Sequence, residues 1–237
     1  MTTGFSPAYL LHSRAFRDDK LLLDLLLPEQ GRLRAVARRP GKKQGGRSHW
    51  PAFALLAVQL TGRGELKTVR ALEEQQPALQ FQGNFLFSAM YINELLCRIW
   101  PQDVASEHLF ALYQQSLLDL AAAQPHPGLL QPVLRRFEFM LLSELGVPVD
   151  LTFDAQQQPL AVDGLYQWQV EAGLVRTGFI DANGRQHGVG WPGEALMAIA
   201  RGQWHDESLR VAKQLCRYLL QPLLGNQPLA SRALFNR

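Results

Sequence analysis

Residues 31–39 read GRLRAVARR, and this stretch decides the fold of the N-terminal part of the chain. Apolar residues alternate with arginines along it: Leu33, Ala35 and Ala37 against Arg32, Arg34 and Arg38. A period of two residues is that of a strand with one face buried. The stretch therefore predicts a strand with one apolar and one cationic face.

Four further runs of strand character surround this stretch. They are AYLLHSRAF (8–16), KLLLDLLLP (20–28), AFALLAVQLTG (52–62) and ELKTVRALE (65–73). Five short strands in about 75 residues fit a small closed barrel, and the five-stranded OB-fold is a barrel of this kind that commonly binds oligonucleotides. We predict an OB-fold domain over residues 1–78.

After Pro77 the pattern becomes helical. Helices are predicted at 81–100, 106–123, 128–146, 193–202 and 208–225, with Ser106 as an N-cap and Gly146 as a C-cap. Between them, residues 151–192 are rich in Gly, Pro, Gln and Asp and hold two short strand-like pieces. The chain is therefore predicted to be an α+β protein whose residues 79–237 form a mostly helical domain with a small β appendage at 151–192.

The charge is unevenly distributed. Residues 1–76 hold 13 Lys and Arg and 7 Asp and Glu, whereas residues 77–237 hold 11 and 14. No acidic residue occurs between Glu29 and Glu65. A field of one sign attracts polyanions, so nucleic-acid binding is favoured over a merely solvated basic loop. No apolar run reaches the roughly 18 to 20 residues of a membrane helix, and no secretion signal is recognisable, so we expect a cytoplasmic protein.

Residues 38–48, RRPGKKQGGRS, come within one residue of a phosphate-binding loop. Gly41, Gly46 and Ser48 hold the spacing, but Arg47 stands where the motif requires Lys. Pro51 and the strand-like run after it argue against the helix N-terminus that such a loop needs. We interpret the stretch as a flexible basic loop that follows a phosphate backbone.

The sequence contains residue types that can catalyse reactions or bind metals, but they do not occur at the mutual spacings that such sites require. The six histidines form no i, i+4 pair and none lies near a cysteine, and the two cysteines, Cys97 and Cys216, are far apart. There is no nucleophile elbow, and the adjacent acidic pairs point to opposite faces of a strand. The sequence predicts no enzyme, no metal and no cofactor.

Aromatic residues accompany the basic segment: Tyr9, Phe16, Trp50 and Phe53. A basic groove with aromatic platforms binds single strands by stacking. Tyr9 and Phe53 have the alternative of filling the barrel, whereas Trp50, beside the loop, is the candidate for an exposed platform. In the helical part, Arg135 and Arg136 begin an apolar helix, either as ordinary surface cations or as an anchor for an acidic peptide.

Five separated segments resemble the RecO family of bacterial recombination and repair mediators. They are YLLHSRAFRDDKLLLDLLLPEQGRLRAVARR (9–39), TGRGELKTVRALE (61–73), MYINELLCRIW (90–100), LRRFEFMLLSELG (134–146) and LLGNQPLASRALF (223–235). The resemblance spans about Tyr9 to Phe235 and is weak over residues 151–192.

The resemblance implies an OB-fold followed by a helical domain, with no turnover chemistry. Family members bind single- and double-stranded DNA, anneal complementary strands and bind the acidic C-terminal tail of the single-stranded-DNA-binding protein SSB. With RecR, and in some pathways RecF, they help RecA replace SSB on DNA, which implies a nucleoid-associated protein. Some members carry a four-cysteine zinc site, but this appendage has no cysteine. We therefore predict no zinc and an appendage held by packing of Trp168, Phe179 and Trp191.

By position, the resemblance assigns the DNA surface to the cationic strand and loop: Arg14, Arg32, Arg34, Arg38, Arg39, Lys42, Lys43 and Arg47. Trp50, proposed above from its place beside the loop, completes the predicted DNA-binding residues as the stacking platform. It assigns the SSB-tail contact to Leu134, Arg135 and Phe137. The alternative is a scaffold whose basic barrel docks an acidic protein and never binds DNA.

Overall fold

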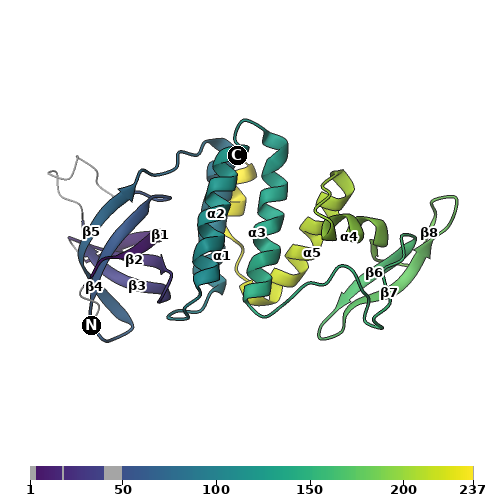
Figure 1. Cartoon of the computed structure of the whole chain (residues 1–237), viewed down its shortest axis with the longest axis horizontal. Coiled ribbons are helices and arrows are strands. Elements are labelled where there is room, and N and C mark those ends of the chain that lie inside the picture. Colours follow the sequence, from purple (N-terminus) through teal and green to yellow (C-terminus); the bar gives the residue numbers. More distant parts are fainter. Residues whose placement is uncertain (1–3, 18, 40–49, 237) are drawn as a thin grey trace. The chain divides into compact units, whose positions relative to one another are not determined.

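The computed structural model describes residues 4–17, 19–39 and 50–236 (Figure 1). The chain divides into two compact units, Met1–Leu130 with Leu224–Arg237, and Gln131–Leu223. The first unit contains the strands of the N-terminal part and the two helices that follow them, and the second contains the remaining long helices and a small sheet. The division thus falls later in the chain than the change of pattern near residue 78.

Five strands form a closed barrel in the order β1-β2-β3-β5-β4. They are β1 (Ser6–Phe16), β2 (Lys20–Leu27), β3 (Gly31–Arg38), β4 (Leu55–Thr61) and β5 (Leu66–Gln76). β3 and β5 pair in parallel, and the other neighbours are antiparallel. The predicted five-stranded barrel and α+β class are confirmed.

The barrel core confirms the alternation read from β3. Leu33, Ala35 and Ala37 are buried in it together with Leu21 and Leu23 of β2. Burying such side chains contributes roughly 1.5–3 kcal/mol for each large aliphatic residue.

The turn from β2 to β3 requires a glycine. Gly31 has a φ of +66°, and a Cβ there would lie 1.8 Å from the carbonyl oxygen of Val104. Neither the conformation nor the space admits another residue. This close approach fixes the start of β3 against the segment that links the first two helices.

Two helices complete the first unit: α1 (Gly83–Ile99) and α2 (Glu107–Ala123), with the short 3₁₀ turns η1 (Pro127–Leu129) and η2 (Ala230–Asn236). The predicted cap is confirmed, since the Ser106 hydroxyl accepts a hydrogen bond from the Leu109 amide at 3.0 Å. Asn93 of α1 donates to the carbonyl oxygen of Leu11 at 2.9 Å and accepts from the Tyr113 hydroxyl at 2.7 Å. One buried amide thus ties β1, α1 and α2 together.

The C-terminal segment is attached to α1. The Glu94 carboxylate accepts hydrogen bonds from the Ala230 and Ser231 amides, both at 2.8 Å, and from the Ser231 hydroxyl at 2.6 Å. Arg98 donates to the carbonyl oxygens of Leu224 at 2.6 Å and Pro228 at 3.1 Å. The segment LGNQPLASRALF (224–235) therefore belongs to the same compact unit as the barrel, although it lies at the other end of the sequence.

The second unit combines helices with a four-stranded sheet. Its elements are α3 (Leu130–Glu144), β6 (Gly164–Gln169), β7 (Gly173–Ile180), β8 (Gln186–His187), β9 (Trp191–Pro192), α4 (Gly193–Ala200) and α5 (Asp206–Leu224), and the sheet order is β8-β7-β6-β9. The C-cap predicted for α3 is confirmed. Gly146 has a φ of +80°, and the Val147 amide donates to the carbonyl oxygen of Leu142 at 2.9 Å.

Tyr166 is the aromatic side chain most deeply buried in the small sheet. It is 1% exposed, and its hydroxyl accepts a hydrogen bond from the Ala161 amide at 2.8 Å. The expected packing through Phe179 is wrong, because that ring is 45% exposed and stacks on His187 with 4.8 Å between centroids. Trp168 and Trp191 are only partly buried. Phe179 pairs with His187 of β8, a strand of two exposed residues, so little of the fold covers its ring.

The described part of the chain offers neither a metal-binding cluster nor a membrane-spanning helix. Residues 4–17, 19–39 and 50–236 contain no group of three His, Cys, Asp or Glu side chains placed to hold a metal ion. Within the same ranges, no helix is long and apolar enough to cross a membrane.

Candidate nucleic-acid interface

The arginines of β3 lie on the outer face of the barrel, opposite the core residues. Strand register sets their neighbours on β2: Arg38 pairs with Lys20, Arg34 with Asp24 and Arg32 with Leu26. On the far side of β2, these three residues pair in turn with Phe16, His12 and Tyr9 of β1. The cationic face predicted from the sequence therefore carries an acidic residue in its middle.

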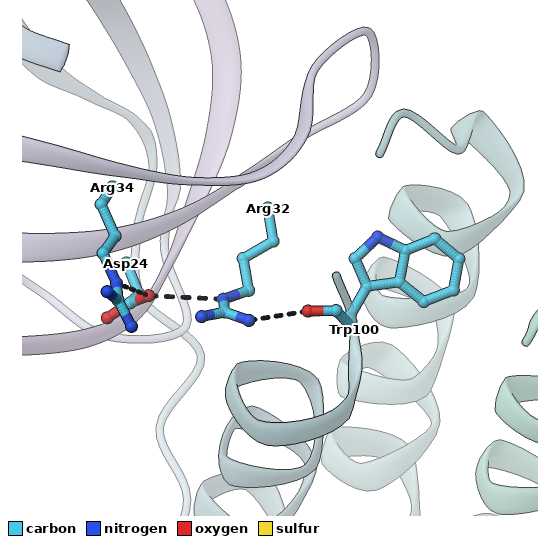
Figure 2. Close-up of polar contacts among 4 residues, drawn as sticks. All are labelled: Asp24, Arg32, Arg34 and Trp100. Carbon is cyan, nitrogen blue, oxygen red and sulfur yellow. Dashed lines mark hydrogen bonds and ion pairs between the residues drawn. The ribbon is translucent and has the colours of Figure 1, made fainter. Parts of the chain in front are cut away.

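Asp24 forms ion pairs with two of the arginines, Arg32 and Arg34. Its Oδ1 lies 3.3 Å from Nε of Arg32 and 3.4 Å from Nε of Arg34. Figure 2 shows the Arg32 guanidinium between the Asp24 carboxylate and the carbonyl oxygen of Trp100, to which Nη1 donates at 2.7 Å. Trp100 is the C-cap of α1, where a positive charge is favoured by the helix dipole.

Arg32 requires a correction. It is only 6% exposed, so the structure places it in a buried ion pair and not on the open surface where the sequence analysis put it. The outer face is covered at this point, as the burial of its neighbour Leu26 also shows. Arg34 differs, because 42% of its side chain is exposed. Its guanidinium contacts Asp24 and still reaches solvent.

Cys97 of α1 lies near the ion pairs that Asp24 forms with Arg32 and Arg34, and its surroundings change the pKa of its thiol. Burial raises the pKa of the Cys97 thiol to about 12, with a further upward contribution from Asp24, while Arg32 and Arg34 act in the opposite direction. A thiol with this pKa stays protonated at neutral pH and is a poor nucleophile. Cys97 is therefore a half-buried structural residue and not a candidate nucleophile.

Cations gather beyond this network, at the end of the barrel where β1 and β3 end and β2 begins. We call this group the cationic end: Arg14, Arg17, Lys20, Arg38 and Arg39. Its four arginines are exposed, and Lys20 is partly buried. The Arg39 amide donates to the carbonyl oxygen of Asp19 at 3.0 Å, which keeps the chain beside the β1–β2 turn. Within the described ranges, no ion pair holds any of the five side chains.

Sequence reasoning missed Arg17 and Lys20. In the segment RDDK (17–20), two acidic residues stand between the two cations, so the net charge is zero and the turn looks neutral. The signal that identifies Lys20 is the strand period, because it lies two residues before Leu22 and four before Asp24 on the same face of β2. Pairing of β2 with β3 then sets Lys20 beside Arg38.

Two of the four aromatic residues pack inside the first unit. The Tyr9 ring is buried, with its centroid 5.3 Å from Phe110 and 5.0 Å from Tyr113, so it packs on α2 and does not fill the barrel. Phe53 is buried with its centroid 5.3 Å from Phe81. Neither ring is available for stacking with a base.

Trp50 is not the open platform that the sequence suggested. It packs against the barrel core, and its indole Nε1 is buried without a hydrogen-bond partner among the described residues. Phe16 is the aromatic residue at the cationic end. It is partly exposed, and the Arg17 guanidinium lies 5.3 Å from its ring centroid, which is within the range of a cation–π contact.

Three predicted DNA contacts, Lys42, Lys43 and Arg47, lie outside the described residues. The segment that holds them follows Arg39 directly in the sequence. Arg39, the last described residue before this segment, belongs to the cationic end.

The predicted SSB-tail residues share one helix, α3, but all are buried. Leu134, Arg135 and Phe137 are 4%, 5% and 1% exposed. Nη1 of Arg135 lies 2.8 Å from Oε2 of Glu138, one turn along the helix. The structure thus brings the three residues together in the interior, where a carboxylate already contacts the arginine.

Comparisons with known proteins agree along the whole chain. Residues 1–77 match the family model described as Recombination protein O N terminal, and residues 80–233 match that described as Recombination protein O C terminal. A DNA repair protein RecO of Pseudomonas putida is 42% identical over 232 residues, which cover 98% of this chain and 96% of the relative. Those of Alteromonas mediterranea and Cellvibrio japonicus are 37% and 41% identical, each covering 99% of this chain and 98% of the relative. The chain belongs to the RecO family.

Proposed function

We propose that this chain is a DNA-binding mediator of recombinational repair, without catalytic turnover. In this proposal it binds single- and double-stranded DNA and anneals complementary strands. It also binds the SSB tail and, with RecR and RecF, promotes loading of RecA in the cytoplasm, at the nucleoid. The observation that carries the DNA-binding part is the cationic end, where five cations lie together without ion pairs in the described part of the chain.

The cationic end suits a phosphate backbone better than a compact anion. Arg14, Lys20 and Arg38 lie on three adjacent strands, and neighbouring strands are about 4.8 Å apart. Cations spread in this way neutralise successive phosphates and read no sequence. In the sequence, three further cations follow Arg39 within eight residues: Lys42, Lys43 and Arg47.

Annealing follows from charge neutralisation. Two strands repel each other through their phosphates, and a cationic surface that holds both lowers this repulsion without making or breaking a covalent bond. Phe16 adds a partly exposed ring beside Arg17, and a base that stacks on such a ring gains about 1–3 kcal/mol. The expected binding is therefore tolerant of sequence and sensitive to salt.

The SSB-tail contact is a separate part of the proposal. It depends on the family resemblance of the LRRFE segment and on the chemistry of an arginine between two apolar residues, which suits a carboxylate next to an apolar end. Because Arg135 already contacts Glu138 in the interior, the tail must replace that contact to bind there.

Fluorescence anisotropy of a labelled single-stranded oligonucleotide with the full chain tests the proposal. We expect binding at low salt that is similar for unrelated sequences and is lost as salt rises. A parallel titration with a labelled acidic SSB-tail peptide tests the second contact. Absence of DNA binding at low salt overturns the proposal, and binding of an acidic protein in its place supports the scaffold alternative.

A further inference from the structure

The second unit contains a cavity of about 820 Å³ that the proposed function does not use. It is bounded by the segment after α3, by the β6–β7 hairpin and by the end of α5. Its volume falls within the roughly 300–1,000 Å³ of ligand-binding pockets. All of its lining residues lie between Gly146 and Leu223, so the cavity belongs wholly to one compact unit.

Three aromatic side chains line this cavity: Phe153, Trp168 and Tyr218. Phe153 is 43% exposed and Tyr218 is 48% exposed, although both are large and apolar. The Tyr218 hydroxyl donates to the carbonyl oxygen of Trp168 at 3.4 Å, which brings α5 and β6 together at the wall of the cavity. Aromatic faces carry negative potential and attract cations.

The charged residues in the lining are all acidic. Asp150, Asp154 and Glu171 line the cavity, and no Lys or Arg is among its lining residues. None of the three carboxylates has an ion-pair partner in the described part of the chain. The unit as a whole is nearly balanced, with 8 Lys and Arg and 10 Asp and Glu in residues 131–223. The acidic character is therefore local to the cavity.

The three carboxylates are not equivalent. Asp150 accepts hydrogen bonds from the amide and hydroxyl of Thr152, and these bonds hold its pKa below the ordinary value. Asp154 is buried and accepts from the amides of Gln156 and Gln158. The Asp150 and Asp154 carboxylates therefore stabilise turns of the backbone. Glu171 is exposed in the β6–β7 turn and accepts no such hydrogen bond from the residues that the structure describes, so its charge is available to a ligand.

We propose that this cavity docks a basic segment of a partner protein, one that presents Arg or Lys beside an apolar side chain. The cation would lie against the aromatic rings and Glu171, while the apolar side chain would pack on the cavity's aliphatic wall, which includes Val147, Leu174 and Leu219. Charge complementarity selects this occupant, because an acidic peptide would meet three like charges. The site is separate from the cationic end and does not rest on DNA binding.

Exposure at the rim favours a protein segment over a small cation. Val170 is 77% exposed and Leu223 is 39% exposed, and both line the cavity. Exposed apolar side chains that form a patch with polar residues at its rim mark protein interaction sites. A ligand that fits wholly inside the cavity would leave these side chains in water, whereas a peptide would cover them.

The test uses the full chain and two fluorescein-labelled heptapeptides, Gly-Leu-Arg-Leu-Lys-Phe-Gly and the same peptide with Glu at both charged positions. We expect the basic peptide to bind and the acidic one not to. Glu171→Gln should weaken basic-peptide binding about three- to tenfold, and Tyr218→Ala by about tenfold. Tyr218→Phe keeps the ring and should bind like the wild type.

Glu194→Gln is the matched control, since it removes one exposed acidic charge from α4, outside the cavity. The proposal is overturned if neither peptide binds, if the acidic peptide binds as well as the basic one, or if Glu194→Gln weakens binding as much as Glu171→Gln. N-acetylarginine amide that binds as tightly as the basic peptide also overturns it, because the cavity is then a small-molecule site. Oligonucleotide binding measured on Glu171→Gln should stay unchanged, which separates this result from the test of DNA binding.

Discussion

The guanidinium of Arg32 and the carboxylate of Asp24 form a buried ion pair, with 3.3 Å between Nε and Oδ1. Arg32 also donates to the carbonyl oxygen of Trp100, so it joins the barrel to the end of α1. Arg38 lies on the same strand and the same face, yet it is exposed. Two arginines that look alike in the sequence therefore have different roles.

Arg32→Ala should destabilise the fold by roughly 3–5 kcal/mol, because it leaves the Asp24 carboxylate buried without its partner. Arg38→Ala is a surface change and should stay within about 0.5 kcal/mol of the wild type. Urea denaturation measures both. Equal stability of the two variants would contradict the structural role of Arg32, as would full stability of Arg32→Ala with a selective loss of DNA affinity.

Tyr113→Phe should cost about 1–3 kcal/mol of unfolding free energy. The change removes the hydroxyl that donates to Asn93 and leaves a buried amide oxygen unsatisfied. Tyr218→Phe is the matched control, since its hydroxyl is in an exposed hydrogen bond. Thermal unfolding compares the two, and an equal shift in Tm would show that the Asn93 contact contributes nothing special.

Stability should fall as pH rises above the ordinary range of a thiol. Burial raises the pKa of Cys97 to about 12 in the folded chain, whereas an unfolded cysteine has a pKa of about 8.5. The folded state therefore holds its proton where the unfolded state has lost it, and the contribution of Cys97 is complete below about pH 8.5 and disappears as pH approaches the folded value. Cys97→Ala should flatten the decline measured by urea denaturation between pH 8.5 and 10, and an unchanged decline in this variant would contradict the assignment.

Attachment of the C-terminal segment should weaken in acid. Burial acts to raise the pKa of Glu94, but hydrogen bonds from Ser231 and Ala230 and the charge of Arg98 outweigh it, so the folded pKa is lowered. The contribution of Glu94 is then present above its unfolded pKa of about 4.3 and is lost as pH falls through the folded value. Hydrogen exchange at the Ser231 amide, followed at neutral pH, should be faster in Glu94→Gln than in the wild type. Equal protection in both proteins would argue against this anchor.

Local patterns in the sequence were sufficient to predict the strands of the barrel and the ends of the helices. The alternation of Leu33, Ala35 and Ala37 predicts a strand whatever surrounds it, and Ser106 and Gly146 mark helix ends through contacts within one turn. Five such strands leave few architectures other than a small barrel.

The candidate site was harder to predict because it depends on register. Nothing in the spacing of Asp24 and Arg32 indicates that they meet, since their contact follows from the pairing of β2 with β3. One signal was available: KLLLDLLL has no alternation, and a strand apolar on both faces is covered on both. Burial of Leu22 and Leu26 on the outer face agrees with that reading.

If the cationic end of the barrel binds the DNA backbone, the affinity for an oligonucleotide must depend on salt through the cations of this end. The variants are Arg38→Ala with Arg39→Ala, and the control removes Arg185 and Arg201, two exposed arginines of the second unit. For single strands, each lost phosphate contact should reduce the slope of log affinity against log salt by about 0.7. The account predicts a shallower slope and weaker binding for Arg38→Ala with Arg39→Ala and a wild-type slope for the control. A wild-type slope for both pairs, or an equal reduction in both, would contradict it.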